Sequence, residues 1–157
     1  MGSKSDYDIM QHCCETLDQL GVAYEARVIS AHRSPDLMFD YASKAESRGL
    51  LAIIAGAGGA AHVAGMVAAM TFVPVLGVPL AATALVGTDA LLSMVMMPAG
   101  VPVGTLAIGK PGAINAAILA AEIVGAHQSE VRERLRAYRQ KRRDEVAATT
   151  LPTPSGS

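Results

Sequence analysis

The sequence predicts an α/β fold in which helices cover both faces of a parallel sheet. Three observations favour this class. Short β-branched runs alternate with Ala-rich helical patterns along the chain, as they do in buried α/β units. Apolar residues occupy consecutive positions of the strand patterns, which is typical of strands buried on both faces. Hydrophobic residues make up 51% of the 157 residues but aromatic residues only 4%, so small side chains must fill a single core.

Each element is placed from capping residues, glycine stops and the period of its apolar residues. Helices carry apolar residues three and four positions apart, whereas strands are short apolar runs that end at glycine or proline. The elements that we expect, in chain order, are a helix over residues 7–20, a strand over 24–29, a helix over 35–48, a strand over 51–55, a helix over 60–70, a strand over 73–78, a helix over 88–96, a strand over 103–108 and helices over 112–124 and 129–146.

Individual residues indicate where the first two helices begin and end. Ser5 or Asp6 can cap the first helix, and Gly21 suits the position just after it. Ser34 and Pro35 fit the N-cap and the first position of the second helix. The carboxyl ends of parallel strands gather at one edge of a sheet, so we expect a ligand site at the loops beyond those ends.

The chain opens with a loop where a strand is expected. Residues 2–6 have the form of a loop between a strand and a helix, yet no strand pattern precedes them. Either the sheet has one member fewer or residues upstream of Met1 supply its first strand, and the alternation of elements favours the second. The rest divides into an α/β domain over residues 1–125, a helical arm over 126–148 and a disordered polar tail over 149–157.

Residues 49–88 contain no Asp, Glu, Lys or Arg. Hydropathy alone raises the question of a membrane span, but glycines and prolines interrupt the stretch and favour buried α/β units instead. The expected helix over residues 60–70 is apolar or small around its circumference apart from His62. We therefore expect another subunit to cover it and no membrane partner.

Composition excludes several other classes. The formal net charge is −1 and the basic residues form no stripe, so we expect no nucleic-acid partner. Cys13 and Cys14 are adjacent, which suits neither a disulfide framework nor a zinc site, and no cluster of His, Cys and carboxylates has metal spacing. We therefore expect no metal. Since the N-terminus also lacks the apolar core of a signal peptide, a reducing cytoplasm fits best.

Residues 30–35 combine groups that suit a phosphorylated substrate with one proton to move. Arg33 can fork two donors onto a phosphate, and His32 can both take and give a proton near neutrality. Ser30 adds a hydroxyl at the end of the preceding strand. The alternative interpretation is a helix cap formed by the same stretch, and the two interpretations are compatible.

Two glycine-containing loops complete the candidate site. In residues 2–6, Ser3 and Ser5 offer hydroxyls to an anion and Asp6 can accept hydrogen bonds from sugar hydroxyls, although a Gly/Ser-rich linker would look similar. Residues 55–62 have the glycine spacing of a dinucleotide fingerprint but no acidic residue about twenty positions further on, so we reject NAD. His62 can hydrogen-bond a ligand there or be a histidine satisfied by the backbone.

Five segments together resemble, in order and spacing, the class I N5-carboxyaminoimidazole ribonucleotide mutases of de novo purine synthesis. The likeness spans residues 1 to about 125 and rests on several motifs in register. The resemblance implies a flavodoxin-like three-layer fold, a homo-octamer, and neither a metal nor an organic cofactor. It also implies a ribonucleotide substrate whose carboxylate moves from the exocyclic N5 to ring carbon C4. The segments are GSKSD (2–6), SAHR (30–33), AGAGGAAH (55–62), GVP (77–79) and MPAGVPV (97–103).

The same resemblance implies a role for each site residue. Ser3, Ser5 and Arg33 would hold the 5′-phosphate and Asp6 the ribose hydroxyls. His32 would be the acid/base that passes a proton between the departing N5 and C4. The other substrate-binding residues, most of them around the carboxylate and the CO2, would be Ser30, Ala31, Gly56, Ala57, Gly58, Gly59 and His62.

The chain departs from the family pattern at four positions. A Ser is usual where this chain has Ala82 and Ala90, a Gln at Met96 and a Pro at Ala64. The loss of two hydroxyls and one amide near a further loop, residues 79–87, can reduce activity or loosen the substrate pocket. Two alternatives therefore stay open: the related aminoimidazole ribonucleotide carboxylase, which uses free CO2, and a catalytically weak paralogue that serves as a nucleotide-binding or assembly module.

Overall fold

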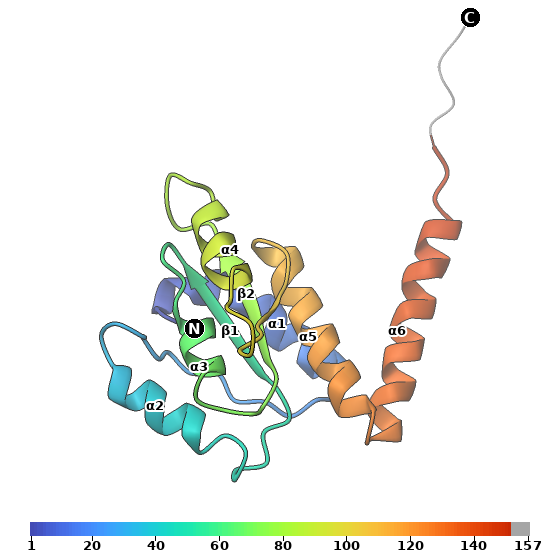
Figure 1. Ribbon diagram of the computed structural model, residues 1–157. Helices are drawn as coiled ribbons and strands as arrows, with labels where there is room; N and C mark the ends of the chain where they lie inside the picture. The colour runs from blue at the N-terminus through green and yellow to red at the C-terminus, as the bar shows by residue number, and fades with distance from the viewer. Residues whose placement is uncertain (152–157) are drawn as a thin grey trace, which may run out of the picture.

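A parallel three-stranded sheet lies at the centre of the computed structural model, which describes residues 1–151 (Figure 1). Every residue of the central strand is buried, as expected for apolar strands covered on both faces. The predicted α/β class with a parallel sheet is therefore confirmed. The strands, in their order across the sheet, are β1 (Ile53–Gly58), β2 (Val75–Leu80) and β3 (Gly104–Thr105).

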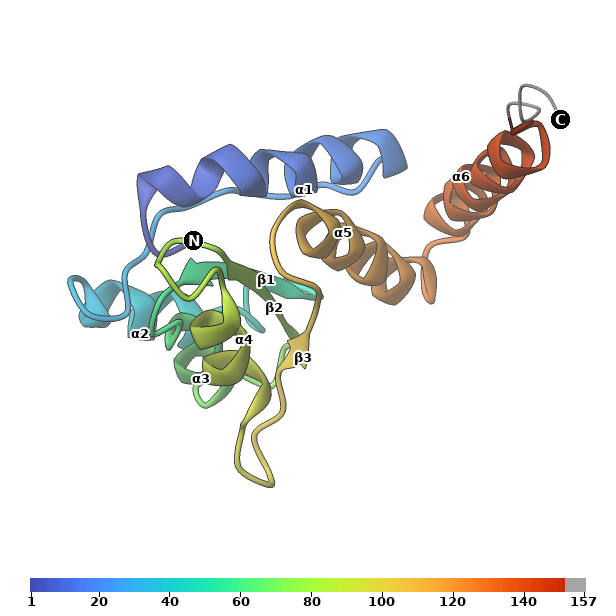
Figure 2. The same ribbon diagram turned by 90° about the horizontal axis from the view of Figure 1, so that it is seen from above.

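Helices form a layer on each face of the sheet, as the view from above shows (Figure 2). Helices α1 and α5 cover one face, and α2, α3 and α4 lie on the other. A short 3-10 turn, η1, leads directly into α1. The bounds are η1 (Lys4–Asp6), α1 (Tyr7–Leu20), α2 (Pro35–Ser43), α3 (Val63–Ala68), α4 (Thr88–Val95), α5 (Lys110–Gly125) and α6 (Ser129–Ala147).

Small side chains bring these helices close to the sheet. The α1 and α5 layer packs Met10 and Leu17 against Val78 of β2, and the α5 side of this contact consists of buried alanines. On the opposite face, Met38 and Met94 reach the sheet from α2 and α4. The prediction that small residues fill the interior is borne out, because the buried α5 positions facing this core are Ala113, Ala116, Ala117 and Ala120.

Helix α6 packs on the body through its first half only. Val131 and Leu135 are buried against α5, and the Arg132 guanidinium donates hydrogen bonds to the carbonyls of Gly125 and Ala126 at 2.8 Å each. Beyond these turns the helix is exposed and extends away from the body (Figure 1). Among the helices in residues 1–151, none has the length and apolarity that crossing a membrane requires.

The strand expected over residues 24–29 does not form. This segment is extended, but its backbone bonds are made to Met1: the Ile29 N–H donates to the Met1 carbonyl at 2.8 Å, and the Met1 ammonium donates to the Arg27 carbonyl at 3.0 Å. A strand needs a neighbour along its length, and beyond Met1 the segment faces a cavity. Propensity alone therefore misassigned it.

Other boundaries differ for local reasons. The helix expected over residues 35–48 ends at Ser43 because the chain then winds into turns, in which the Ser43 and Ser47 hydroxyls donate to nearby carbonyls. Of the strand expected over 103–108, only Gly104–Thr105 pairs regularly, although the Leu106 N–H still reaches the carbonyl of β2 Gly77 at 2.8 Å. The predicted tail lies outside the described residues from position 152 onward.

A matched pair of valines on α6 tests this packing. Val131→Ala removes two buried methyl groups, so we expect the free energy of unfolding to fall by about 1.5 kcal/mol or more. Val146 lies on the same helix and is 75% exposed, so Val146→Ala should change the free energy of unfolding by less than about 0.5 kcal/mol. Urea unfolding of both variants makes the comparison, and equal values would show that α6 does not pack on the body as described.

Candidate active site

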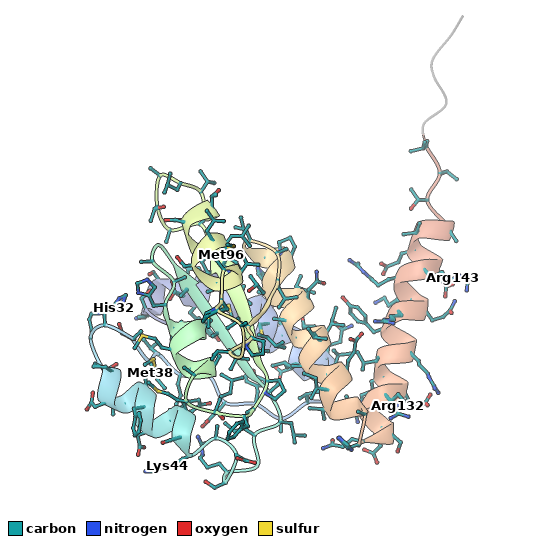
Figure 3. All side chains as sticks on the ribbon, in the orientation of Figure 1. His32, Met38, Lys44, Met96, Arg132 and Arg143 are labelled. Carbon is teal, nitrogen blue, oxygen red and sulfur yellow. The ribbon has the colours of Figure 1, made fainter. Side chains whose placement is uncertain are left out.

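Three loops meet where strand β1 ends. The Gly2 N–H donates to the Gly56 carbonyl at 3.2 Å, which joins the loop over residues 2–6 to β1. The Arg33 Nη2 group donates to the Gly2 carbonyl at 2.9 Å, which joins the loop after residue 29 to the same point. Figure 3 shows His32 on the opposite side of the molecule from Arg132 and Arg143 of α6. The structure thus brings together the loops over residues 2–6, 30–35 and 55–62 that the sequence singled out.

Ser30 and Ser34 shape the turn that carries His32 and Arg33. The Ser30 Oγ accepts from the Arg33 backbone N–H and from its Nε, each at 3.2 Å, while the Ser34 Oγ both donates to and accepts from the Ser30 backbone at 3.1 Å. Ala31 is buried in the core and anchors the turn. Ser34 occupies the N-cap of α2, but its hydroxyl serves this turn and not the helix. The guanidinium is consequently aimed at Gly2.

The two histidines of the predicted site contact one another. The His32 Nε2 and the His62 Nδ1 lie 2.9 Å apart, and the rings meet edge to face with their centroids separated by 5.0 Å. Both side chains are exposed, and His62 holds the N-cap position of α3. One ring must donate and the other accept, so a single proton on the shared edge links them. Such a pair can give a proton to a ligand and recover it.

Ser3, Ser5 and Asp6 lie together at the start of α1. The Ser3 and Ser5 hydroxyl oxygens are 2.8 Å apart, and the Asp6 carboxylate accepts from the Ser3 backbone N–H at 2.8 Å. Asp6 is buried, whereas Ser5 is exposed. The Asp6 side chain therefore turns back onto its own loop instead of capping α1. Two hydroxyls at this distance can both donate to one anionic oxygen.

Glycines at the end of β1 are required by close packing. A Cβ on Gly58 would lie 2.4 Å from the Ala82 Cβ and 3.0 Å from the Leu80 carbonyl oxygen, and one on Gly56 would lie 2.5 Å from the Met10 sulfur. Gly59 adopts φ +64°, a left-handed conformation that favours glycine. Gly56 and Ala57 are buried, while Gly58 and Gly59 are half-buried.

The loop over residues 79–87 lies beside the turn after β1, where Ala82 approaches Gly58. The Thr83 hydroxyl donates to the Asp89 carboxylate at 2.6 Å, and this bond, followed by the Ala90 N–H, lowers the pKa of that carboxyl. Gly87 is the N-cap of α4, so Asp89 lies in the first turn and does not itself begin the helix. Ala90 is fully buried and Met96 is 77% exposed. The Ala at position 90, where the family usually has Ser, therefore lies in the core.

Sequence reasoning missed Gly2 as a site residue. Its N–H and its carbonyl both take part in the contacts that join the three loops. The available signal was its place in a loop that has the form of a strand-to-helix connection. The partners of its backbone N–H and carbonyl depend on tertiary structure, which the sequence does not show. Within the described part of the chain, no three His, Cys, Asp or Glu side chains gather so as to hold a metal ion.

A guanidinium, an imidazole pair and clustered hydroxyls beyond the end of a parallel strand define an α/β site suited to a small anionic ligand. The chain belongs to the AIR carboxylase family, whose model matches residues 1–145. The predicted family resemblance is therefore confirmed.

Curated relatives match over almost the whole chain. A protein of Vibrio cholerae is 59% identical over 152 residues, which cover 97% of this chain and 94% of the relative. A protein of Escherichia coli K12 is 54% identical over 157 residues, which cover 100% of this chain and 92% of the relative. Both are named N5-carboxyaminoimidazole ribonucleotide mutase. The crystal structure of Treponema denticola PurE superposes with a TM-score of 0.82 at 23% identity, covering 94% of this chain and 90% of that one, which supports the predicted flavodoxin-like fold.

Substitution at Gly58 tests the packing at the end of β1. Gly58→Ala should lower the free energy of unfolding by about 1 to 3 kcal/mol, because the new methyl group overlaps Ala82 and the Leu80 carbonyl. The double variant Gly58→Ala/Ala82→Gly removes the closest contact and should recover part of that loss. Thermal and urea unfolding measure both effects. A double variant no more stable than Gly58→Ala alone would show that Ala82 is not the obstacle.

Proposed function

We propose that this chain is an N5-carboxyaminoimidazole ribonucleotide mutase that moves a carboxylate from N5 to C4 of the imidazole ribonucleotide. The observation that carries the proposal is the contact of His32 with His62 beside the Arg33 turn, in a chain 53–59% identical to relatives named N5-carboxyaminoimidazole ribonucleotide mutase. A hydroxyl cluster, a fixed guanidinium and a proton-carrying pair are the groups that a phosphorylated substrate with one mobile proton requires.

The ribonucleotide binds along the loop at the start of α1. Ser3, Ser5 and Arg33 hold the 5′-phosphate: the two hydroxyls lie together, and Arg33 donates to the carbonyl of Gly2, the residue before Ser3. The Asp6 carboxylate is bound by one backbone N–H and has further lone pairs for the ribose hydroxyls. This arrangement directs the base toward the end of β1, where His32 and His62 lie.

His32 moves the proton in two balanced steps. In the first, the N5–carboxyl bond breaks, CO2 leaves, and His32 donates a proton to N5. In the second, C4 forms a bond to the carbon of CO2, and His32 takes the proton that C4 releases. No net proton is consumed. The His62 imidazole contacts the His32 ring and keeps that ring oriented through the cycle.

The CO2 is retained by small residues and backbone. We assign Ser30, Ala31, the turn over residues 56–59 and His62 to the carboxylate and the CO2, as the family resemblance implies. A pocket of this kind keeps the gas over C4 and excludes water between the two steps. A carbamate releases CO2 on protonation, so the route uses side chains alone and requires neither metal nor organic cofactor. Cys13 and Cys14 are free thiols, which suits a reducing cytoplasm.

The carboxylase that takes free CO2 is the second candidate, since it would use the second step alone on the same site. Curated relatives at 53–59% identity carry the mutase name, which favours the mutase. Supplying N5-carboxyaminoimidazole ribonucleotide and, separately, aminoimidazole ribonucleotide with bicarbonate distinguishes the two. Conversion only in the second assay would replace the mutase by the carboxylase, and ligand binding without either conversion would indicate a binding module.

We also propose that the enzyme is a homo-oligomer, with eight chains as the family suggests. Phe72, which follows α3, is 96% exposed, and Leu92 and Val95 of α4 are 53% and 50% exposed. Helices α3 and α4 lie on the same face of the sheet (Figure 2). Apolar side chains grouped on one layer are typical of surfaces that a second subunit covers. Ala60 and His62 before α3 are exposed on the same layer, so assembly would close the site.

Light scattering tests the assembly. The unchanged chain should have the mass of about eight subunits. Phe72→Asp should shift it to smaller species, because burying a charge at an interface is unfavourable. Val146→Asp, on the exposed half of α6, should leave the mass unchanged. A well-behaved monomer of the unchanged chain would contradict the proposal.

His32→Asn separates chemistry from binding. Asparagine keeps a hydrogen bond but cannot shuttle a proton, so we expect turnover to fall by about 100- to 10,000-fold while the ribonucleotide still binds. His12→Asn is the matched control, because His12 lies on α1 bonded to Glu15 and away from the site. Near-normal turnover of His32→Asn would remove His32 from the mechanism.

Arg33→Ala should show the reciprocal pattern. Loss of one charge-assisted contact to the phosphate weakens binding by about 1.5 to 3 kcal/mol, which titration calorimetry of the ribonucleotide measures. Arg136→Ala, on the exposed face of α6, is the matched control. Unchanged affinity in Arg33→Ala would place the phosphate elsewhere.

A further inference from the structure

A cluster of four side chains joins the two arms on either side of the turn over residues 30–34. One arm is the extended segment that ends at residue 29, and the other is α2 with the turns that follow it. Each arm contributes two members to the cluster. We call this cluster, which consists of Glu25, Arg27, Tyr41 and Arg48, the clamp.

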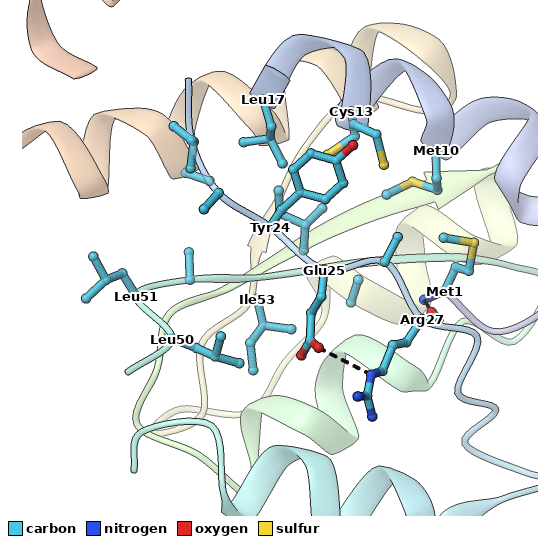
Figure 4. A pocket seen from close by; sticks show the side chains of 18 of the residues that line it. Met1, Met10, Cys13, Leu17, Tyr24, Glu25, Arg27, Leu50, Leu51 and Ile53 are labelled. Atoms are coloured by element: carbon cyan, nitrogen blue, oxygen red, sulfur yellow. Dashed lines mark hydrogen bonds and ion pairs between the residues drawn. The ribbon is translucent and has the colours of Figure 1, made fainter. Parts of the chain in front are cut away.

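Glu25 binds both arginines of the clamp. Its Oε2 lies 3.3 Å from the Arg27 Nε, an ion pair that Figure 4 shows, and its Oε1 accepts a hydrogen bond from the Arg48 Nη2 at 2.7 Å. Of these two bonds, the one to Arg48 crosses from one arm to the other. The Arg48 guanidinium lowers the pKa of Glu25, so the carboxylate is ionised at neutral pH and the bond is present there.

The Tyr41 ring provides a second contact between the arms. The Cζ atoms of Arg27 and Arg48 lie 5.9 and 5.3 Å from the ring centroid, within the range of cation–π contacts. Arg27 thus reaches from the first arm to a ring on the second. The ring is half-buried and packs against the core, so both guanidinium groups contact a fixed surface.

Apolar packing holds the same two arms nearer the turn. Ile29 of the first arm and Met38 of α2 pack in the core on this face of the sheet. Apolar contacts are non-directional, so they constrain the separation of the arms more than the angle between them. The clamp lies further from the turn and consists of directional bonds. It therefore fixes the angle that the apolar packing leaves open.

A small change in this angle is enough to affect the turn. Tyr41 lies seven residues beyond Ser34, which is about 10 Å along a helix. Over that length, a rotation of α2 by about 5° moves the start of the helix by about 1 Å. A misplacement of about 1 Å can lower the rate of a catalytic step by about 100-fold.

We propose that Glu25 is a positioning residue for His32. Its bond to Arg48 sets the angle between the arms, and this angle determines how the His32 ring meets His62, 2.9 Å away. The inference rests on the proposed function, in which His32 moves the proton. Glu25 itself touches neither the histidine pair nor the substrate.

The test compares Glu25→Gln with Asp40→Asn in the full chain. Glu25→Gln keeps the size of the side chain but removes the charge that joins the arms, so we expect kcat to fall about 5- to 20-fold. Asp40 is an exposed carboxylate that pairs with Lys44 within one arm, so Asp40→Asn should change kcat by less than about twofold. An unchanged kcat in Glu25→Gln, or an equal loss in both variants, would overturn the proposal.

Stability and affinity distinguish positioning from general destabilisation. Exposed ion pairs contribute little to stability, so the Tm of Glu25→Gln should fall by less than about 4 °C. Its affinity for the ribonucleotide should stay within about twofold, because Arg33 keeps its own bonds to Ser30 and Gly2. A loss of kcat that only matches a loss of folded protein at the assay temperature would overturn the proposal.

A double variant tests whether the bond between the arms is responsible. Glu25→Gln and Arg48→Gln each break the same bond, so the double variant should lose no more than about twofold in kcat beyond Glu25→Gln alone. Losses that multiply in the double variant would show that the two residues act independently, which contradicts the proposal.

The histidine rings provide a readout that does not depend on turnover. In NMR spectra of the full chain with isotope-labelled histidine, Glu25→Gln should shift the ring signals of His32 and His62 but not those of His12 on α1. Unchanged signals of the pair would overturn the positioning role. If no version of the chain converts the ribonucleotide, the proposed function alone fails, and these signals still decide whether Glu25 positions His32.

Discussion

The arrangement of the site depends on the backbone of Gly2. Its N–H donates to Gly56 of β1 and its carbonyl accepts from the Arg33 guanidinium, so one residue joins three loops that are far apart in the sequence. Backbone groups are suited to this role because their position follows from the chain path and not from a rotamer. The loops therefore keep their spacing as long as residues 1–2 stay between the segment over residues 27–29 and β1.

Small residues make these close approaches possible. Alanines of α5 lie against β2, and the glycines of the turn after β1 allow Ala82 and Met10 to come within contact distance. Larger side chains would force the layers apart, because protein interiors have little spare volume. The composition that favours an alanine- and glycine-rich core thus also determines how near the catalytic loops lie to one another.

Local signals predicted much of the fold, whereas tertiary contacts determined the rest. Gly21 ends α1 in a left-handed conformation, as its position just after the last residue of the predicted helix indicates. The segment over residues 24–29 has strand propensity but no strand beside it, and no local pattern reveals whether a neighbour exists. Likewise, His32 and His62 are each recognisable as candidates, but their contact spans 30 positions and depends on how α2 and α3 pack. The spacing of the two histidines in the sequence does not predict the distance between their rings.

The bonds of Arg33 have a consequence for recognition. Its guanidinium is held through Nε by Ser30 and through Nη2 by the Gly2 carbonyl, which uses only part of its donor set. In the proposed function, a phosphate would therefore meet a side chain that is already held in place, and binding would lose little rotamer entropy. Lysine at this position would lack the planar fork that keeps both bonds while still facing a ligand. Under that proposal, selectivity for a tetrahedral dianion would come from geometry as well as from charge.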